Sequence, residues 1–329
     1  MSQSGRGGSP NGSPGRRSAG RRRTALRAAA ILFALALGAS PWLVWRALQA
    51  PRVPVPPRAP RVLRDVTVIE PGRSRRRHRD LVIADGRIRT ERASHARVDG
   101  DGGSGGGFVL PGLIDLHVHY PPRVAAGNAE LWSLLFLAHG VTSLRETGSI
   151  DGSIFEVRRE IRAGRTPGPR IFACGPMLDG DPPSFPSNRV VRSAADADRA
   201  VDALAADGAD CVKVYNMLSR EALHAIHRAA KRHALPVIGH KPHAVSLEEA
   251  HISDLQHLTG APEVDVERVA RQDFRFEDWW TVDERRMQYV ERVSLAQGIA
   301  YTPTLVNAHL RALLLDPSRA NGDSGLRHL

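Results

Sequence analysis

Residues 110–120 read LPGLIDLHVHY, and this stretch decides how the rest of the chain is interpreted. Its apolar residues indicate a buried strand, and His117 and His119 end that strand. Residues i and i+2 of a strand point to the same side, so both imidazoles can reach one point. Such a pair is also compatible with a surface position where a strand runs out. The choice between metal ligands and surface residues depends on whether the rest of the chain supplies further ligands for a metal ion.

The body of the chain alternates short apolar strands with helical stretches. Predicted strands lie at 112–119, 140–146, 169–175, 210–216, 236–240, 254–259 and 300–306. Predicted helices lie at 129–139, 154–164, 194–208, 220–233, 246–252 and 283–298. Alternation of this kind favours parallel β/α units. Seven strands are one short of a (β/α)8 barrel. The sequence therefore predicts an α/β fold of the TIM-barrel type that is incomplete, with strand eight missing.

Three polar residues mark the ends or middles of later strands. His240 and His257 lie at or near strand ends, where barrel enzymes place functional groups. A single strand-end histidine is more often structural than a metal ligand. Lys213 is harder to explain, because an unpaired lysine between Val212 and Val214 costs several kcal/mol of desolvation. The chain has only three lysines and otherwise uses arginine. A lysine amine can react with carbon dioxide to form a carbamate that bridges two cations, which arginine cannot do.

Taken together, the motifs of these strands resemble the amidohydrolase superfamily, in its imidazolonepropionase-like or prolidase-like branch. VLPGLIDLHVH is followed by GVTSLRE, GPRIFACG, GADCVKVYN, PVIGH and DLQHLT in the family's order and spacing. The resemblance covers about residues 61–306. It implies a metal-dependent hydrolase that acts on amide, cyclic amide or dipeptide carbon–nitrogen bonds through a metal-activated hydroxide. The substrate partner would accordingly be a small molecule or a dipeptide.

The resemblance also implies a set of metal ligands. Two divalent ions, zinc in most members, would be held by His117 and His119 on one side and by His240 and His257 on the other. Carbamylated Lys213 would bridge them. Candidate substrate contacts lie just after strand ends or beside the lysine, at Tyr120, Tyr215 and His243.

The chain departs from the family pattern near its C-terminus. Members carry a catalytic aspartate after strand eight, and the only superficial match is Asp323 in NGDSG. It comes too early and no strand precedes it, so the catalytic base is not identified. The sequence therefore looks like a C-terminally truncated member. Two alternatives stay open: a catalytically inactive protein that retains a metal site, and a basic tethering protein that contacts anionic lipid.

The first 60 residues are expected to form a targeting region. Residues 1–24 are a basic tail of disordered composition, 25–46 an apolar signal or transmembrane anchor, and 47–60 a proline-rich linker. An uncleaved anchor is favoured over a cleaved signal, and the positive-inside rule places the body outside the cytoplasm. If the segment is cleaved, the body is secreted or periplasmic.

The folded body is expected to have two parts. Residues 61–108 would form a partial β-sandwich, with an antiparallel strand pair at 62–70 and 80–90, and residues 109–329 would form the barrel. Residues 1–99 carry a net charge of +15 and the remainder −4, so the charge does not favour a uniform nucleic-acid-binding surface. Cys174 and Cys211 lack the spacing of a metal motif and are interpreted as small buried residues.

Overall fold

The fold is taken from a computed structural model, which describes residues 59–95, 106–122, 129–264, 277–278 and 282–315, with residues 38, 44 and 55. The chain divides into two compact units, Met1–Ala50 and Pro51–Leu329, and the description below concerns the second. Within the described residues, no helix is both long enough and apolar enough to cross a membrane. The expected tail and apolar segment lie outside the described residues apart from Gly38 and Val44.

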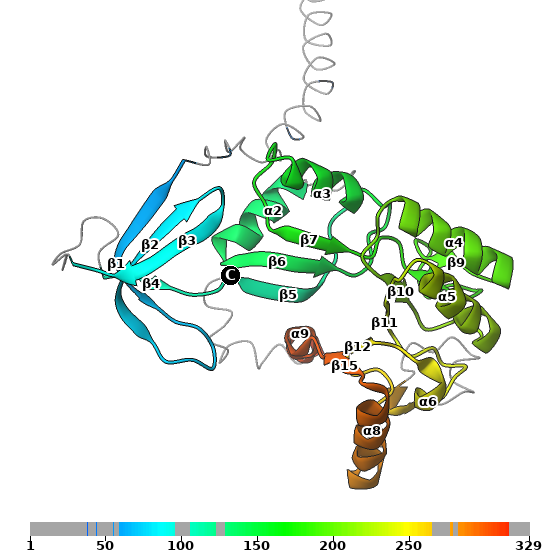
Figure 1. The fold of residues 1–329 in the computed structure, drawn as a ribbon. Helices are drawn as coiled ribbons and strands as arrows, with labels where there is room; N and C mark the ends of the chain where they lie inside the picture. Colours follow the sequence, from blue (N-terminus) through cyan, green and yellow to red (C-terminus); the bar gives the residue numbers. More distant parts are fainter. Residues whose placement is uncertain are drawn as a thin grey trace, which may run out of the picture. The chain divides into compact units, whose positions relative to one another are not determined.

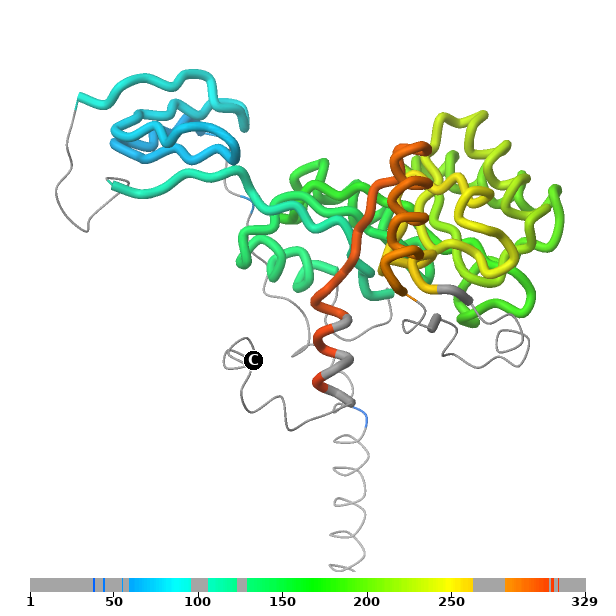
Figure 2. Tube along the Cα trace, turned by 90° about the horizontal axis from the view of Figure 1, so that it is seen from below, coloured from blue at the N-terminus to red at the C-terminus, as the bar shows by residue number. Residues whose placement is uncertain are grey.

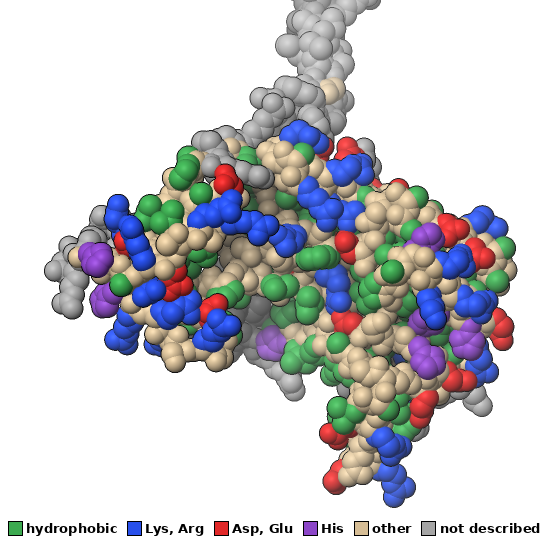
Figure 3. All heavy atoms as spheres, in the orientation of Figure 1, with side chains coloured by type: hydrophobic (Ala, Val, Ile, Leu, Met, Phe, Trp, Pro, Cys, Tyr) green, Lys and Arg blue, Asp and Glu red, His purple; other side chains and the backbone are tan. Residues whose placement is uncertain are grey.

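A four-stranded sheet opens the second unit. It contains β1 (Arg61–Val68), β2 (Arg76–Ala84), β3 (Arg87–Ala93) and β4 (Phe108–Val109) in the order β3-β2-β1-β4. The prediction of a single strand at 80–90 was wrong, because this stretch contains the end of β2, a turn and the start of β3. Asp85 and Gly86 form the turn with φ angles of 54° and 70°, the backbone that a tight hairpin requires. Arginine side chains, blue on the left of Figure 3, gather over this sheet, which contains no lysine.

The remainder is a mixed α/β fold with parallel strands. Its first half contains β5 (Leu113–Val118), α2 (Ala129–Ala138), β6 (Val141–Glu146), α3 (Ile154–Arg162), β7 (Arg170–Ala173), β8 (Leu178–Asp179), β9 (Arg189–Val190) and α4 (Ala194–Ala206). Its second half contains β10 (Val212–Val214), α5 (Arg220–Arg232), β11 (Val237–Gly239), α6 (Leu247–Ala250), β12 (Asp254–Gln256), β13 (Glu263–Val264), β14 (Glu277–Asp278), α8 (Glu284–Gln297), β15 (Ala300–Thr302) and α9 (Leu305–Leu315). All seven predicted barrel strands are therefore present, each shorter than predicted (Figure 1).

The parallel strands form two sheets, β5-β6-β7 and β15-β12-β11-β10-β8-β9. The amide N–H of Asp210 donates to the carbonyl of Ala173 at 2.8 Å, so the end of β7 meets the segment that enters β10. Lys213 on β10 lies opposite Ile238 on β11, which lies opposite Asp254 on β12. These registers bring the C-terminal ends of β10, β11 and β12 to one edge.

Helices cover these strands and bury an apolar core between the layers. The first turns of α4 and α5 are capped by Ser193 and Ser219, whose hydroxyl groups accept backbone N–H bonds. Both helices bury alanine and leucine side chains against the strands, together with Val201 on α4 and Ile226 on α5. The two helices lie side by side, and Figure 2 shows the chain continuing from them through yellow α6 to orange α8.

A disulfide links Cys174 to Cys211 across 37 positions of sequence. Both residues are buried, as the sequence predicts, but the expectation that they are merely small core residues was wrong. Cys174 follows β7 directly and Cys211 precedes β10 directly, so the bond fastens two neighbouring strands.

Strand β5 has an exposed apolar surface. It pairs with β6 on one side, and no strand within the described residues pairs with its other edge. Leu113, Ile114 and Leu116 are 60%, 65% and 48% exposed. Single exposed leucines are ordinary, but three on one short strand form an apolar strip.

Candidate functional site

The four predicted histidine ligands lie at the C-terminal ends of parallel strands. His117 is the second-last residue of β5, and His119 is the first residue after that strand. His240 and His257 follow β11 and β12 directly. The ring centroid of His117 is 5.1 Å from that of His119 and 4.5 Å from that of His257. The rings of His240 and His257 are 5.0 Å apart. The structure therefore brings all four imidazoles into one continuous cluster.

A backbone carbonyl fixes the protonation of His119. Its Nδ1 lies 3.0 Å from the carbonyl oxygen of Gly148, and a carbonyl can only accept a hydrogen bond. Desolvation lowers the pKa of His119, so the ring is neutral at neutral pH. A neutral imidazole that donates from Nδ1 carries a lone pair on Nε2. That Nε2 lies 3.2 Å from Nε2 of His117.

His240 is held in the same way by Asn216. Nδ1 of His240 lies 2.8 Å from Oδ1 of Asn216, which leaves Nε2 unprotonated. Complete burial holds the pKa of His240 well below its usual value, and the Lys213 cation lowers it further. The Nε2 atom is buried and has no hydrogen-bond partner within the described residues. A buried acceptor without a partner costs about 1–3 kcal/mol unless something binds it.

Thr304 performs this role for His257. Nδ1 of His257 lies 2.5 Å from Oγ1 of Thr304, whose hydroxyl already donates to the carbonyl of Pro303 at 2.8 Å. The hydroxyl must therefore accept the Nδ1 proton of His257. His257 and Thr304 have φ angles of 57° and 49°, a backbone region that non-glycine residues seldom adopt. Strained residues of this kind gather at functional sites.

His117 is the exception among the four. Desolvation lowers its pKa to about 2, and the Lys213 cation is the next contribution. Its Nδ1 is buried and has no hydrogen-bond partner in the part of the chain described here. Unlike the other three, His117 is thus not oriented by an acceptor at Nδ1; the one hydrogen-bond contact of its ring within the described residues is that of Nε2 with His119.

Lys213 lies in the middle of β10 and its side chain is 0% exposed. Burial lowers its pKa to about 7, the charge of Arg145 lowers it too, and Asp254 and Glu146 oppose the shift. Its Nζ contacts Oε1 of Gln256. An amine with this pKa is largely uncharged slightly above neutral pH and is then nucleophilic.

The donor set fits a divalent ion of the zinc type. Three imidazoles held by outer acceptors, with Nε2 unprotonated, are the usual arrangement around zinc. Two nitrogens 3.2 Å apart can both bind one ion at about 2.1 Å. Among the described residues, however, no three His, Cys, Asp or Glu side chains meet closely enough to hold an ion. The cluster is a set of oriented donors rather than a closed ligand cage.

The candidate substrate contacts separate into two groups. The ring of Tyr215 lies 4.0 Å from that of His240 and 5.7 Å from that of Phe185, so it borders the histidine cluster. His243 donates its backbone N–H to Asn216, and burial lowers its pKa to about 4. Tyr120 does not reach the cluster: it is 3% exposed and its hydroxyl meets Ser133 in the core.

Sequence reasoning missed the outer acceptors, which are Gly148, Asn216 and Thr304. Asn216 is the last residue of the predicted strand 210–216 and Thr304 lies within the predicted strand 300–306, so their position near strand ends was a usable signal. Gly148 contributes only a carbonyl oxygen, for which the sequence offers no signal. Asp323 lies outside the described residues.

The family model that describes the amidohydrolase family matches residues 108–275, about half of the chain. The chain belongs to the amidohydrolase family. This assignment accounts for the parallel α/β architecture and for histidines at the strand ends. The predicted resemblance is therefore confirmed.

Several solved structures resemble the chain. Bottromycin amidohydrolase shares 24% identity at a TM-score of 0.56, over 80% of this chain and 54% of its own. An Xaa-Pro dipeptidase with bound methionine shares 18% at 0.51, over 75% and 67%. Ochratoxinase of A. niger shares 18% at 0.52, over 77% and 68%. The chain thus spans only about half the length of bottromycin amidohydrolase. No curated protein sequence matches it.

Proposed function

We propose that this amidohydrolase is a metal-dependent hydrolase of carbon–nitrogen bonds. One observation carries the proposal: His119, His240 and His257 each present an unprotonated Nε2 because an outer acceptor takes the Nδ1 proton. Lys213, buried and with a pKa lowered to about 7, lies among the same strand ends. We propose His117, His119, His240 and His257 as metal ligands and Lys213, carbamylated, as the bridge between two ions.

Divalent ions held there would supply Lewis-acid activation of a water molecule and of the scissile carbonyl. The chain's own residues supply the rest. The outer acceptors keep the imidazoles neutral and oriented, so no proton has to leave Nε2 before a metal ion binds there. Tyr215, which packs on His240, is placed to contact the substrate beside the ions.

Dipeptides with a C-terminal proline, cyclic amides and modified peptides are the proposed substrates. Two structures that share the fold are named for hydrolysis of Xaa-Pro dipeptides and for an amidohydrolase of bottromycin, which supports carbon–nitrogen bonds of this kind. We further propose an eight-stranded barrel as the complete architecture, since the seven predicted strands occur here in chain order.

Metal content measured together with turnover tests the proposal. The purified chain, loaded with zinc, should hold close to two zinc ions and cleave Xaa-Pro dipeptides or cyclic amides. Lys213→Ala should lower the zinc content while the fold, followed by circular dichroism, persists. A folded wild-type chain without zinc refutes the proposal. Two bound ions with no turnover on these substrates support a binding protein instead of an enzyme.

We also propose that the body works in an oxidising compartment, outside the cytoplasm. The Cys174–Cys211 disulfide supports this location, because such bonds persist where thiols are not kept reduced. Fractionation of producing cells, followed by trapping of free thiols before lysis, tests it. A chain recovered from the cytosol with both thiols free contradicts it.

A further inference from the structure

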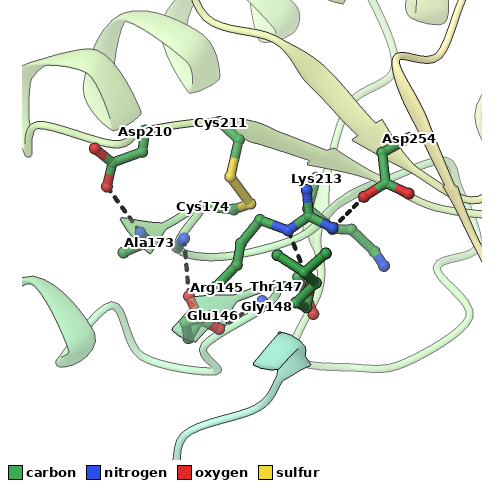
Figure 4. Close-up of a disulfide and its surroundings, with 12 residues drawn as sticks. Arg145, Glu146, Thr147, Gly148, Ala173, Cys174, Asp210, Cys211, Lys213 and Asp254 are labelled. Atoms are coloured by element: carbon green, nitrogen blue, oxygen red, sulfur yellow. Dashed lines mark hydrogen bonds and ion pairs between the residues drawn. A yellow bond between two sulfur atoms is a disulfide. The ribbon is translucent and has the colours of Figure 1, made fainter. Parts of the chain in front are cut away.

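Glu146 is a buried carboxyl group to which the proposed function gives no role. It ends β6 and is 0% exposed. Its two oxygens reach different loops: Oε1 accepts the N–H of Gly148 at 2.5 Å and Oε2 accepts that of Gly175 at 3.2 Å. Figure 4 shows Glu146 beside Gly148, with the Cys174–Cys211 disulfide above them in this view. A buried carboxyl group is costly unless its oxygens are hydrogen-bonded, and here both are.

Gly148 connects Glu146 to the histidine cluster. The N–H of Gly148 is held by Glu146, and the carbonyl of the same residue accepts the Nδ1 proton of His119. The φ angle of Gly148 is 147°, a value that glycine alone adopts without strain. Thr147 N–H bonds the carbonyl of Val118 at 2.8 Å, between the two histidines of β5. The direction of the Gly148 carbonyl is therefore fixed from both sides.

The second oxygen of Glu146 connects to the strand that carries Lys213. Gly175 follows Cys174, whose N–H also bonds the backbone carbonyl of Glu146 at 3.0 Å. Cys174 is bonded to Cys211, two residues before Lys213. One side chain thus holds the loop behind His119 and the loop that is fastened to β10.

We propose that Glu146 is a positioning residue for His119: it holds the Gly148 carbonyl against Nδ1 and so fixes the ring's tautomer and orientation. The inference rests on the proposed function only for the ligand role of His119. Its specificity comes from two oxygens that both accept a backbone N–H, because even a protonated carboxyl keeps lone pairs on its hydroxyl oxygen. Gln has nearly the same shape but presents an NH₂ group to one of the two N–H donors, so it breaks one of the two contacts.

Nuclear magnetic resonance of the metal-free full chain tests the inference directly. Two-bond proton–nitrogen spectra of ¹⁵N-histidine-labelled protein distinguish the two neutral imidazole tautomers. The His119 signal is identified by its loss in His119→Asn. The wild-type ring should be a single Nδ1–H tautomer, and Glu146→Gln and Glu146→Leu should convert it to a mixture. An unchanged single tautomer in a folded Glu146→Gln or Glu146→Leu chain overturns the inference.

Asp210→Asn is the matched control. Asp210 is also a carboxylate that holds a neighbouring strand, since it accepts the N–H of Ala173 at 2.8 Å and pairs with Arg158. Within the described residues its carboxylate bonds Ala173 and Arg158 and not Gly148 or His119, so Asp210→Asn should lower stability without changing the His119 tautomer. A change of tautomer in this control shows that general loosening is enough, and it also overturns the inference.

Zinc affinity, measured by calorimetry, separates the two proposals. Loss of an outer partner of a metal-binding histidine lowers affinity about 10- to 100-fold. We expect a loss of that size in Glu146→Gln and none in Asp210→Asn. If the wild-type chain binds no zinc, the proposed function fails, while the tautomer spectra still decide the role of Glu146. Wild-type affinity in a folded Glu146→Gln chain counts against the inference.

Discussion

The guanidinium group of Arg145 on β6 donates a hydrogen bond to the carboxylate of Asp254 on β12. The two side chains are 17% and 9% exposed, and both also contact the hydroxyl of Thr302 on β15. Nε of Arg145 bonds the carbonyl of Leu116 on β5 at 2.9 Å. One arginine therefore joins strands of the two parallel sheets close to the histidine cluster.

Loss of this arginine should be strongly destabilising. Arg145→Met leaves the buried Asp254 carboxylate without its cation, and removing one partner of a buried pair costs about 3–5 kcal/mol. The double variant Arg145→Met/Asp254→Leu should cost less than the single one, because no uncompensated charge remains. Urea unfolding of wild type, Arg145→Met, Asp254→Leu and the double variant measures the coupling. Additive losses would mean that the pair contributes no interaction of its own.

A small carboxylate should partly restore zinc binding to Lys213→Ala. The substitution removes the amine proposed to form the carbamate and leaves space in a fully buried position. Acetate or propionate can enter that space and supply two oxygen donors. Zinc content after dialysis with and without propionate is the readout. Lys213→Arg, which fills the space with a cation, is the control that should not respond.

Gly148→Ala should disturb both stability and zinc binding. The φ angle of Gly148 is 147°, and an added Cβ would lie 2.6 Å from Cγ of Met177 and 3.2 Å from Cε1 of His119. Gly164→Ala is the matched control, since Gly164 has φ 70° but nothing within 4 Å of the added atom. The control variant should lose about 1 kcal/mol of unfolding free energy. Gly148→Ala should lose more unfolding free energy and should also bind zinc less tightly. Equal losses in thermal midpoint would remove the steric argument.

Removal of the disulfide should lower stability by about 2–4 kcal/mol, because the bond closes a loop across 37 positions. Cys174→Ser/Cys211→Ser and reduced wild type should unfold at similar urea concentrations, both below the oxidised protein. Intact mass before and after reduction checks that the bond forms. A reductant that shifts the double variant as much as wild type would point to a cause other than this bond.

Glu146 should make the metal-free protein less stable as pH rises from about 5 to about 8. Burial raises its pKa from 4.5 to about 8, so in this window the folded state keeps a proton that the unfolded chain has released. At about 1.4 kcal/mol per pKa unit, the loss has an upper limit of about 5 kcal/mol. The contribution of Glu146 is isolated by comparing the unfolding free energies of wild type and Glu146→Gln at pH 5 and pH 8. Lys213, whose pKa is lowered to about 7, acts in the opposite direction but is present in both proteins.

The strands were predictable because buried parallel strands are short continuous apolar runs, such as Val212 and Val214 around Lys213. The Asp85-Gly86 turn was missed, although this dipeptide is a standard hairpin signal, because residues 80–90 were predicted as one strand. The outer acceptor Gly148 was not predictable, because any residue has a carbonyl oxygen. The disulfide required the knowledge that β7 and β10 are neighbours. Spacing alone does not give this pairing, so Cys174 and Cys211 looked unrelated.

The apolar strip along β5 also limits how the protein can be handled. Leu113, Ile114 and Leu116 are solvent-exposed on a strand whose second edge meets no described strand, and such an edge templates the addition of another chain. Light scattering from purified protein should therefore rise more steeply than in proportion to concentration. Zinc titrations and turnover assays carried out at different dilutions would then report on different mixtures of monomer and aggregate.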